Sequence, residues 1–200
     1  MAPTRWIDPV SLEGNFSRLV PLAENDVPAI AEAVNDGRLW ELWYTSVPTP
    51  EQAADWVRTA LEQREQLGAM PFTIRDPKTD RIIGCTRYFN VAAEHRRLEI
   101  GHTWYRASVQ RTGANTESKL LLLAHAFERL RSQAVEFRTH YMNVTSRRAI
   151  ERLGARLDGI LRHHMTMPDG SLRDTCVYSI IAPEWPAVRN NLQYKLSRHD

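Results

Sequence analysis

The residues from Gln110 to Glu117, with the sequence Gln-Arg-Thr-Gly-Ala-Asn-Thr-Glu, form the pattern with the clearest chemical meaning in this chain. They lie between a strand-like segment, 98–105, and a leucine-rich segment, 118–130, with helical spacing. A turn from a strand into a helix leaves several backbone N–H groups unpaired at the positive end of the helix dipole, which favours a phosphate or pyrophosphate. The amides expected to hold this group belong to Arg111, Thr112, Gly113, Ala114, Asn115 and Thr116.

Other well-known site patterns do not fit the sequence. A dinucleotide-binding fingerprint needs three spaced glycines and a P-loop needs Gly-Lys-Ser/Thr, whereas Gly113 stands alone in this turn. The histidines and the two cysteines do not have the spacing of zinc ligands, so we expect no metal. The chain also lacks the Gly-x-Ser-x-Gly elbow of serine hydrolases and a base-stacking platform, so nucleic acid is not an expected partner.

The composition is that of an ordinary globular protein. The chain has 200 residues, of which 42% are hydrophobic and 25% charged, and a formal charge of +2. This length suits a single domain over residues 1–200, with a core at 14–182 and a C-terminal helix at 184–196. The first residues, 1–9, lack the apolar stretch of a signal peptide and no later run approaches a membrane span, so we expect a cytoplasmic protein without a membrane partner.

The elements around the turn follow a mixed pattern of strands and helices. Strands are expected at residues 16–22, 72–75, 81–89, 97–105, 134–140, 159–167 and 173–181. Thr49-Pro50-Glu51-Gln52 has the signature of a capping box that opens a helix, and Asn143 and Gly154 are suited to begin and end another. The strand–helix–strand unit over 97–140 predicts parallel pairing. The fold class is therefore α+β, with a mixed, mostly antiparallel sheet of about seven strands flanked by helices.

Three motifs occur in a characteristic order. The first, Gln110-Arg111-Thr112-Gly113-Ala114-Asn115, has asparagine, which tolerates left-handed backbone, at its last position. The second is Asn143-x-x-Ser146-x-x-Ala149-Ile150-Glu151-x-Leu153-Gly154-Ala155, and the third is Asp169-Gly170-x-x-Arg173-Asp174-Thr175. Together they resemble the GNAT superfamily of acyl-CoA-dependent N-acyltransferases, whose phosphate motif reads Gln/Arg-x-x-Gly-x-Gly/Ala. The likeness is nearest to the branch of bacterial ribosomal-protein N-terminal acetyltransferases, and it covers residues 14–182.

The resemblance implies transfer of an acetyl group from acetyl-CoA directly to a primary amine, without a metal. The amine is that of a protein N-terminus or of a small molecule. In this family the oxyanion meets backbone N–H donors on a strand that splays from its neighbour. Here that strand segment contains the cofactor-contacting residues Thr103 and Trp104, and Gly101 is expected to permit a bulge.

The same chemistry asks for a proton acceptor for the amine and a proton donor for the sulfur. Glu99 is the first candidate base, because a partly buried carboxylate has a raised proton affinity, and His102 is the second. Ser146 is the candidate that assists the departing sulfur. The alternatives are that Glu99 pairs with an arginine across the sheet, that His102 only packs, and that Ser146 only caps its helix.

The remaining contacts expected from the resemblance concern the two substrates. Asn143 is expected to bind a pantetheine amide, and Arg111 or Arg148 to add positive charge near a phosphate, although Arg147 and Arg148 also suit a solvated helix face. The acceptor-binding loop of the family corresponds to the segment with Trp40, Glu41, Trp43 and Tyr44. Aromatic rings there suit a cleft wall or a cation-binding face, although such segments more often pack in a core.

Two rival functions fit the same motifs. One is a non-catalytic module that binds acyl-CoA as a sensor or a platform for partners. The other is a transferase for a larger acyl-CoA such as succinyl-CoA, which needs a basic group near the acyl pocket. The final hairpin and the terminal helix also offer a surface for a homodimer.

Overall fold

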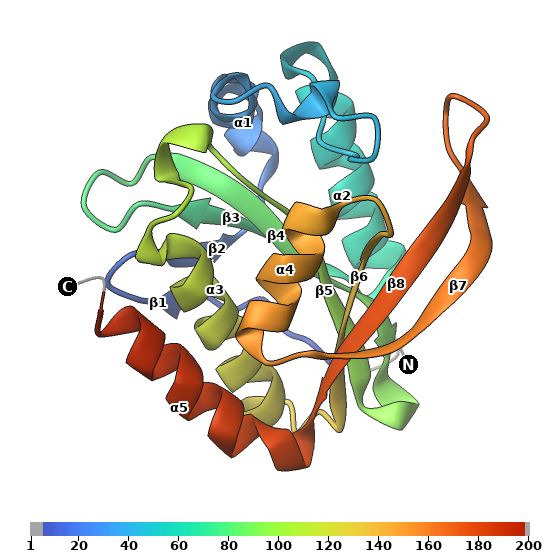
Figure 1. Ribbon diagram of the computed structural model, residues 1–200. Coiled ribbons are helices and arrows are strands. Elements are labelled where there is room, and N and C mark those ends of the chain that lie inside the picture. Colours follow the sequence, from blue (N-terminus) through green and yellow to red (C-terminus); the bar gives the residue numbers. More distant parts are fainter. Residues whose placement is uncertain (1–5, 199–200) are drawn as a thin grey trace, which may run out of the picture.

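The computed structural model describes residues 6–198, which form a single mixed sheet with helices on both faces (Figure 1). Residues 1–5, on which part of the expectation of a cytoplasmic protein rests, lie outside the described residues. The strands are β1 (Leu12–Glu13), β2 (Arg18–Pro21), β3 (Met70–Arg75), β4 (Ile82–Ala92), β5 (Arg97–Tyr105), β6 (Ala134–His140), β7 (Arg156–Thr166) and β8 (Leu172–Ile181). The helices are α1 (Val27–Asn35), α2 (Ala53–Leu67), α3 (Gly113–Ala124), α4 (Val144–Leu153) and α5 (Trp185–Leu196). The predicted α+β class is confirmed.

The sheet has eight strands in the order β1-β2-β3-β4-β5-β6-β8-β7, one more than expected. The extra strand, β1, is only two residues long and pairs Leu12 with Leu19 of β2. A strand this short shows no period-two pattern in the sequence, so only the pairing partner reveals it. All neighbouring strands are antiparallel except β5 and β6, as the strand–helix–strand pattern predicted.

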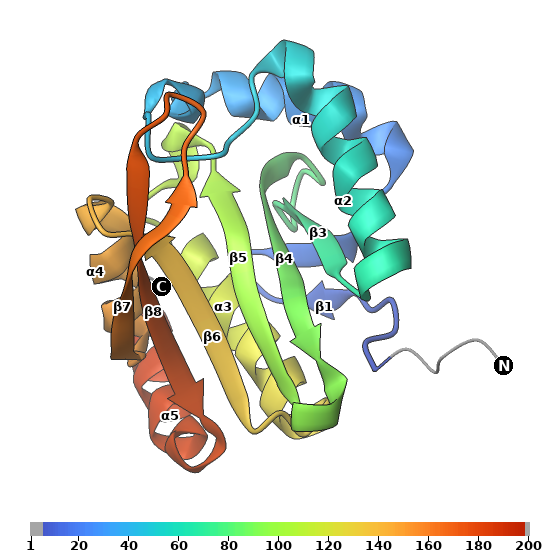
Figure 2. The same ribbon diagram turned by 90° about the vertical axis from the view of Figure 1, so that its right-hand side faces the viewer.

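The two faces of the sheet are covered unequally. Helices α3, α4 and α5 lie on one face, and the main core between them and the sheet includes Leu98, Ile100, Leu122 and Tyr178. Helices α1 and α2 lie on the other face, where α2 packs on β3 and β4. Figure 2 shows no helix of residues 6–198 over β6, β8 and β7 on the side that carries α2. No helix of that part of the chain therefore covers the α2 side of these strands.

The parallel strands β5 and β6 pair only at their beginnings. Their register joins Arg97 to Ala134, Leu98 to Val135 and Glu99 to Glu136, and no later residues of the two strands pair. Figure 2 shows the two strands moving apart beyond this point. Because no strand of residues 6–198 pairs with the β6-facing edge of β5 after Glu99, the backbone polar groups of that edge need other partners.

Local sequence signals account for the helix boundaries. The Thr49 backbone N–H donates to Gln52 Oε1 at 3.1 Å, as in the predicted capping box, and leads through a short 3-10 turn into α2. Helix α4 ends at Gly154, which has the left-handed φ of 105° expected for it. Among residues 6–198, no helix is both long enough and apolar enough to cross a membrane.

Candidate active site

The beginning of α3 has the geometry expected for binding an anion. Thr112 is the N-cap residue, and its Oγ1 accepts a hydrogen bond from the Ala114 N–H at 3.3 Å. No side chain among the described residues caps the amides of Gly113 and Asn115, so these are donors for a ligand. Asn115 lies inside the helix, and the left-handed residue of the turn is Arg111, with φ of 65°. The turn therefore does not use the tolerance of asparagine for left-handed backbone.

Gly113 is required for packing. A Cβ atom at this position would lie 2.9 Å from Cγ of Phe16. The loop that holds Phe16 is fixed to α3, because the Glu117 carboxylate accepts hydrogen bonds from the backbone N–H groups of Asn15, Phe16 and Ser17 at 2.7 to 2.8 Å. The small size of Gly113 thus serves the contact between this loop and the helix, rather than only the approach of a ligand.

We expect Gly113→Ala to lower the free energy of unfolding by about 1 to 3 kcal/mol, because the added methyl group overpacks the Phe16 ring. Chemical denaturation measures this loss. Gly159→Ala in β7 is the matched control, since a Cβ there meets no atom within 4 Å. Equal stability of the two variants would contradict the packing role of Gly113.

Strand β5 contains a bulge beside the opening between β5 and β6. The β4–β5 register passes from Cys85–Trp104 to Arg87–Gly101, so that Thr86 faces both His102 and Thr103. His102 has a left-handed φ of 49° and makes this bulge, whereas Gly101 was expected to do so. Gly101 is needed for another reason, because a Cβ on it would lie 2.6 Å from Cε1 of Phe89. A bulge of this kind redirects backbone N–H groups that a regular ladder would occupy.

A buried lysine, which sequence analysis missed, lies beneath the bulge. Lys119 of α3 is 6% exposed, and its Nζ donates to Thr103 Oγ1 at 2.7 Å and to Thr86 Oγ1 at 3.4 Å. No carboxylate of residues 6–198 forms an ion pair with it, and burial lowers its pKa to about 7. A signal was present, since Lys119 precedes the buried Leu122 and Leu123 by three and four residues, which places it on the inner stripe of α3.

Glu99 stands at the last paired position of β5 and β6 and is 2% exposed. The Asn90 side-chain amide donates to Glu99 Oε2 at 2.8 Å, and Arg138 Nε lies 3.4 Å from the same oxygen, an ion pair without hydrogen-bond geometry. Burial raises the pKa of Glu99 to about 7, although Asn90 and Arg138 both act to lower it. Glu99 is therefore both paired across the sheet and suited to accept a proton near neutral pH.

His102, the second candidate base, lies on the same side of the sheet. Its ring packs edge-on against Phe89, with 4.8 Å between the ring centroids. Loss of solvent around the ring, followed by the charges of Arg87 and Arg173, lowers the pKa of His102. The imidazole is consequently neutral at physiological pH, although the residue itself is exposed on the surface.

A cavity of about 420 Å³ adjoins these residues. It lies between α2 and strands β4 and β5, and its wall includes Phe89, Asn90 and His102. Phe89 is paired with Glu99 in the register, so that the two side chains lie on the same face of the sheet. The cavity wall thus includes Asn90, which donates to the Glu99 carboxylate, but not Glu99 itself.

The beginning of α4 carries the Asn143 and Ser146 pair. Asn143 is the N-cap residue, and its Oδ1 accepts from the Ser146 backbone N–H at 3.0 Å. The capping role considered for Ser146 therefore belongs to Asn143, and the Ser146 hydroxyl has no hydrogen-bond partner within the described part of the chain. Ser146 is only partly buried, so this hydroxyl is accessible to a ligand.

The arginines that were considered as phosphate ligands differ in their surroundings. Arg147 donates from Nε to the Tyr178 hydroxyl at 3.2 Å and lies over the Tyr141 ring, so it does not belong to a solvated helix face. Arg111 and Arg148 are exposed and form no ion pair with any of residues 6–198. Among the predicted phosphate contacts, the Thr116 hydroxyl is already occupied, because it is buried and accepts from Arg152 at 2.9 Å.

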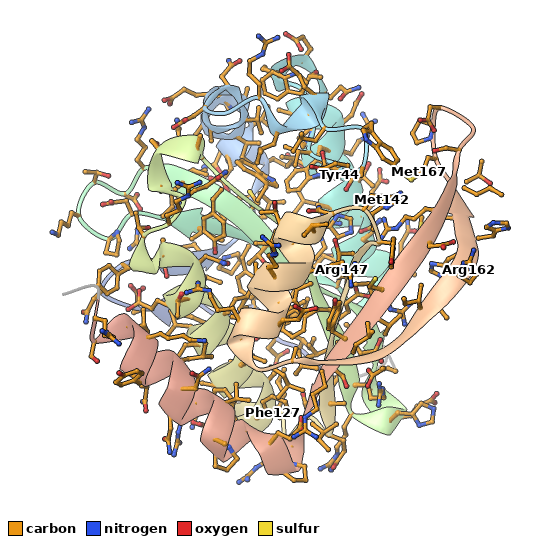
Figure 3. The ribbon with its side chains drawn as sticks, viewed as in Figure 1. Tyr44, Phe127, Met142, Arg147, Arg162 and Met167 are labelled. Atoms are coloured by element: carbon orange, nitrogen blue, oxygen red, sulfur yellow. The ribbon has the colours of Figure 1, made fainter. Side chains whose placement is uncertain are left out.

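The aromatic segment before α2 divides into a packed part and an exposed part. Trp40 packs against the core under α1 and α2, and Glu41 forms an ion pair with Arg38. Trp43 is 53% exposed and its ring centroid lies 5.0 Å from that of His140 at the end of β6. Figure 3 shows Tyr44 of this segment at the same end of the molecule as Met142 and Met167, which follow β6 and β7. Trp43 and Tyr44 thus lie beside the end of β6, and their role in binding an acceptor stays a prediction.

The side chain of Trp104 belongs to the core. It is 5% exposed, and its ring centroid lies 6.5 Å from that of Trp56 in α2. Any contact of Trp104 with a ligand in the opening would have to come from its backbone. Within residues 6–198, no three side chains of histidine, cysteine, aspartate or glutamate are grouped to hold a metal ion.

The candidate residues thus meet at the opening from two sides. Glu99, His102 and the 420 Å³ cavity lie on the α2 side. The start of α3 and the start of α4, with Ser146, lie on the opposite side (Figure 1).

Comparison with known proteins agrees with this geometry. The acetyltransferase (GNAT) domain family matches residues 18–156. The curated N-acetyltransferase YoaA of Bacillus subtilis (strain 168), itself uncharacterized, is 27% identical over 138 residues, which are 66% of this chain and 74% of that protein. An acetyltransferase structure from T. thermophilus is 35% identical, with a TM-score of 0.83 over 96% of this chain and 99% of that one.

A ribosomal-protein-serine acetyltransferase structure from Vibrio cholerae has the same fold, with a TM-score of 0.74 over 88% of this chain and 99% of that one, at 17% identity. The family pattern spans more than half of the sequence and includes the bulged strand β5, the start of α3 and the start of α4. The chain belongs to the GNAT family and is an acyl-CoA-dependent acetyltransferase.

Proposed function

We propose that the protein transfers an acetyl group from acetyl-CoA to a primary amine in a ternary complex, with Glu99 as the base. The observation that carries this proposal is the position of Glu99. It is a buried carboxylate with a pKa raised to about 7, located where β5 and β6 cease to pair. An amine on the α2 side and a thioester in the opening would both be within its neighbourhood.

The donor fits the other side of this opening. Beyond Glu99, the β6-facing edge of β5 has backbone donors and acceptors that no strand pairs, and the two amides of a pantetheine arm can pair with such an edge. The free amides of Gly113 and Asn115 would receive the pyrophosphate, and the exposed Arg111 and Arg148 would add charge. The Asn143 amide nitrogen is available for a pantetheine carbonyl, because only its Oδ1 is used in the cap.

The proposed reaction needs one proton transfer from the attacking amine and one to the departing thiolate. Glu99 takes a proton from the amine, whose nitrogen attacks the thioester carbonyl carbon and forms the C–N bond. A backbone N–H of the bulge at His102 and Thr103 stabilises the oxyanion. The C–S bond then breaks, the thiolate of coenzyme A receives a proton from the Ser146 hydroxyl, and the Ser146 oxygen takes a proton back from solvent. The Glu99 carboxylic acid returns its proton to solvent.

The acceptor is a protein N-terminus or a small-molecule amine. The test is to follow release of the free thiol while the purified protein is mixed with acetyl-CoA and a panel of peptides, amino acids, polyamines and aminoglycosides. We expect thiol release with at least one acceptor class. Tight coenzyme binding without turnover for all of them would instead support the acyl-CoA sensor.

The cytoplasmic location and the single domain over residues 1–200 stay predictions.

We expect Ser146→Ala to reduce kcat by about 10- to 100-fold while the affinity for acetyl-CoA changes by less than about threefold, because the hydroxyl is free for the leaving sulfur. Steady-state kinetics and calorimetry measure the two quantities. Thr145→Ala, at the exposed neighbouring position of the same turn, is the control. Equal losses of kcat and affinity would show that the hydroxyl serves binding alone.

A further inference from the structure

The face that carries Glu99 also holds more positive than negative charge. Alternate residues of a strand point to the same face of the sheet, and paired residues of neighbouring strands share a face. Phe89 pairs with Glu99, and Thr175 pairs with His140. From these pairings, a set of polar side chains lies on the α2 side. This set comprises Arg87 of β4, Arg97 and Glu99 of β5, Glu136, Arg138 and His140 of β6, and Arg173 and Thr175 of β8. Its four guanidinium groups outnumber its two carboxylates.

Two of the four guanidinium groups in this set take part in its ion pairs, and two do not. Arg138 pairs with both Glu99 and Glu136, and Arg97 pairs with Glu136 as well. Neither Arg87 nor Arg173 has a carboxylate within ion-pair distance in the described part of the chain. Two cations on this face therefore have no carboxylate partner in that part of the chain.

Arg173 is the more accessible of the two. It is half-buried on β8, and its one hydrogen bond to residues 6–198 runs from Nε to Thr175 Oγ1 at 2.9 Å. The terminal nitrogens, which are the ones that bind a carboxylate in the side-by-side manner, have no partner in that part of the chain. It lies two residues from Thr175, which pairs with His140, and its charge acts on Glu99, His102 and His140.

Arg87 is held in place and contributes charge from the other side. It is 2% exposed, donates from a terminal nitrogen to Gln63 and lies 5.3 Å from the centroid of the Trp56 ring. Burial lowers its pKa to about 10, so the group still carries its charge at physiological pH. His102 lies under the influence of both Arg87 and Arg173.

A buried hydrogen-bond donor without a partner adds an independent observation. His140 is 4% exposed, and its Nδ1 accepts from the Met142 backbone N–H at 3.0 Å, which requires the ring proton to be on Nε2. This Nε2–H group is buried and has no partner among the described residues. A buried donor left unpaired is unfavourable, and a ligand that accepts its hydrogen bond would remove this penalty. The Trp43 ring, in the segment before α2, packs edge-on against the His140 ring, with 5.0 Å between the ring centroids.

We propose that the acceptor carries a carboxylate close to the amine that is acetylated, and that Arg173, together with His140 Nε2–H, binds this carboxylate while Glu99 takes the proton of the amine. The chemical class is an α-amino acid, or a peptide with aspartate or glutamate at its N-terminus. This inference rests on the proposed function. It extends that function by naming the chemistry that selects the acceptor.

Matched acceptors test this proposal in two arms. The first compares α-amino acids with their carboxamides, and the second compares peptides that begin with aspartate or glutamate with those that begin with asparagine or glutamine. We expect kcat/KM to be at least about 10-fold higher for the carboxylate member of one arm, because a charged hydrogen-bonded pair is lost in the amide. The arm that shows the preference identifies the source of the carboxylate.

The Arg173→Gln variant is expected to reduce this preference to about one, with an unchanged affinity for acetyl-CoA. Arg162→Gln, on the neighbouring strand of the same hairpin, is the control, because Arg162 is exposed and already pairs with Asp174 (Figure 3). Melting temperatures of both variants report folding. Equal use of carboxylate and amide acceptors by the native protein, or a preference that survives in Arg173→Gln, would overturn the proposal while leaving acetyl transfer intact.

A binding measurement separates this proposal from the proposed function. Calorimetry of the protein loaded with coenzyme A, titrated with the carboxylate and amide member of each pair, needs no turnover. Tighter binding of the carboxylate member, lost in Arg173→Gln, would support the anion site even if no acetyl transfer were observed. Equal binding of both members would overturn it.

Discussion

Glu99→Gln is expected to reduce kcat/KM for the amine by about 10²- to 10⁴-fold, the range typical of a general base, while acetyl-CoA binds as before. The amide keeps the size of the side chain but has no site to take the proton. The variant should also remain folded. Burial raises the pKa of Glu99 from 4.5 to about 7, so stability falls as the pH rises between these values and stays lowered above them, and a neutral glutamine removes this cost.

The pH dependence offers a second readout for Glu99. In the native protein, kcat/KM should fall as the pH drops below about 7, because the base is then protonated, and Glu99→Gln should lack this limb. Glu136→Gln is the matched control, since Glu136 also pairs with Arg138 but lies one strand away, on β6. A comparable loss in both variants would mean that the charge of the cluster, and not proton transfer by Glu99, is what activity needs.

Lys119→Met is expected to raise the free energy of unfolding at pH 7 by several kcal/mol. Burial lowers the pKa of Lys119 from 10.5 to about 7, so between these values the unfolded chain binds a proton that the folded protein does not. The native protein must therefore gain stability as the pH rises from about 7 towards 10.5. The advantage of the variant over the native protein should shrink by about 1.4 kcal/mol for each pH unit in this window.

Denaturant titrations at about pH 7, 8 and 9 test the Lys119 prediction, with Lys78→Met in an exposed turn as the control. The two threonines under the bulge stay satisfied in Lys119→Met, because Thr86 and Thr103 also bond to each other at 2.8 Å. An advantage that does not change with pH, or a loss of stability in the variant, would show that the buried ammonium is compensated by its surroundings.

The layout of the fold was largely predictable from the sequence because its elements carry strong local signals. The capping box at Thr49 and the glycine at the end of α4 set helix boundaries that the structure has. The parallel pairing of β5 and β6 follows from the helix between them. The two-residue strand β1 lacks such a signal, because its pairing with β2 depends on tertiary structure.

The site could be predicted only where the chemistry depends on residues that are near in sequence. The start of α3 and the Asn143 cap are local features and were found. The left-handed residues of the bulge and the turn are His102 and Arg111, and neither has the freedom to adopt this conformation that glycine has. Such conformations are imposed by tertiary packing, which the sequence does not display residue by residue.

Side chains brought together across the sheet were also beyond local sequence reasoning. Arg173, His140 and Glu99 come from three strands that are far apart in the chain, and their proximity follows from the strand order β5-β6-β8. Lys119 was read as part of a leucine-rich helix, and its burial depends on the rotation of α3 against the sheet. In both cases the strand order and the helix orientation had to be known first.

The short ladder between β5 and β6 gives the molecule a seam. Within residues 6–198, the sheet consists of two halves, strands β1–β5 and strands β6–β8. Only three residue pairs, all between β5 and β6, connect these halves by strand pairing. A change in the angle between the two halves would break few main-chain hydrogen bonds, whereas longer antiparallel ladders hold each half together. A thioester lodged there would tie one half to the other, so loading with donor should slow amide hydrogen exchange on both sides of the seam.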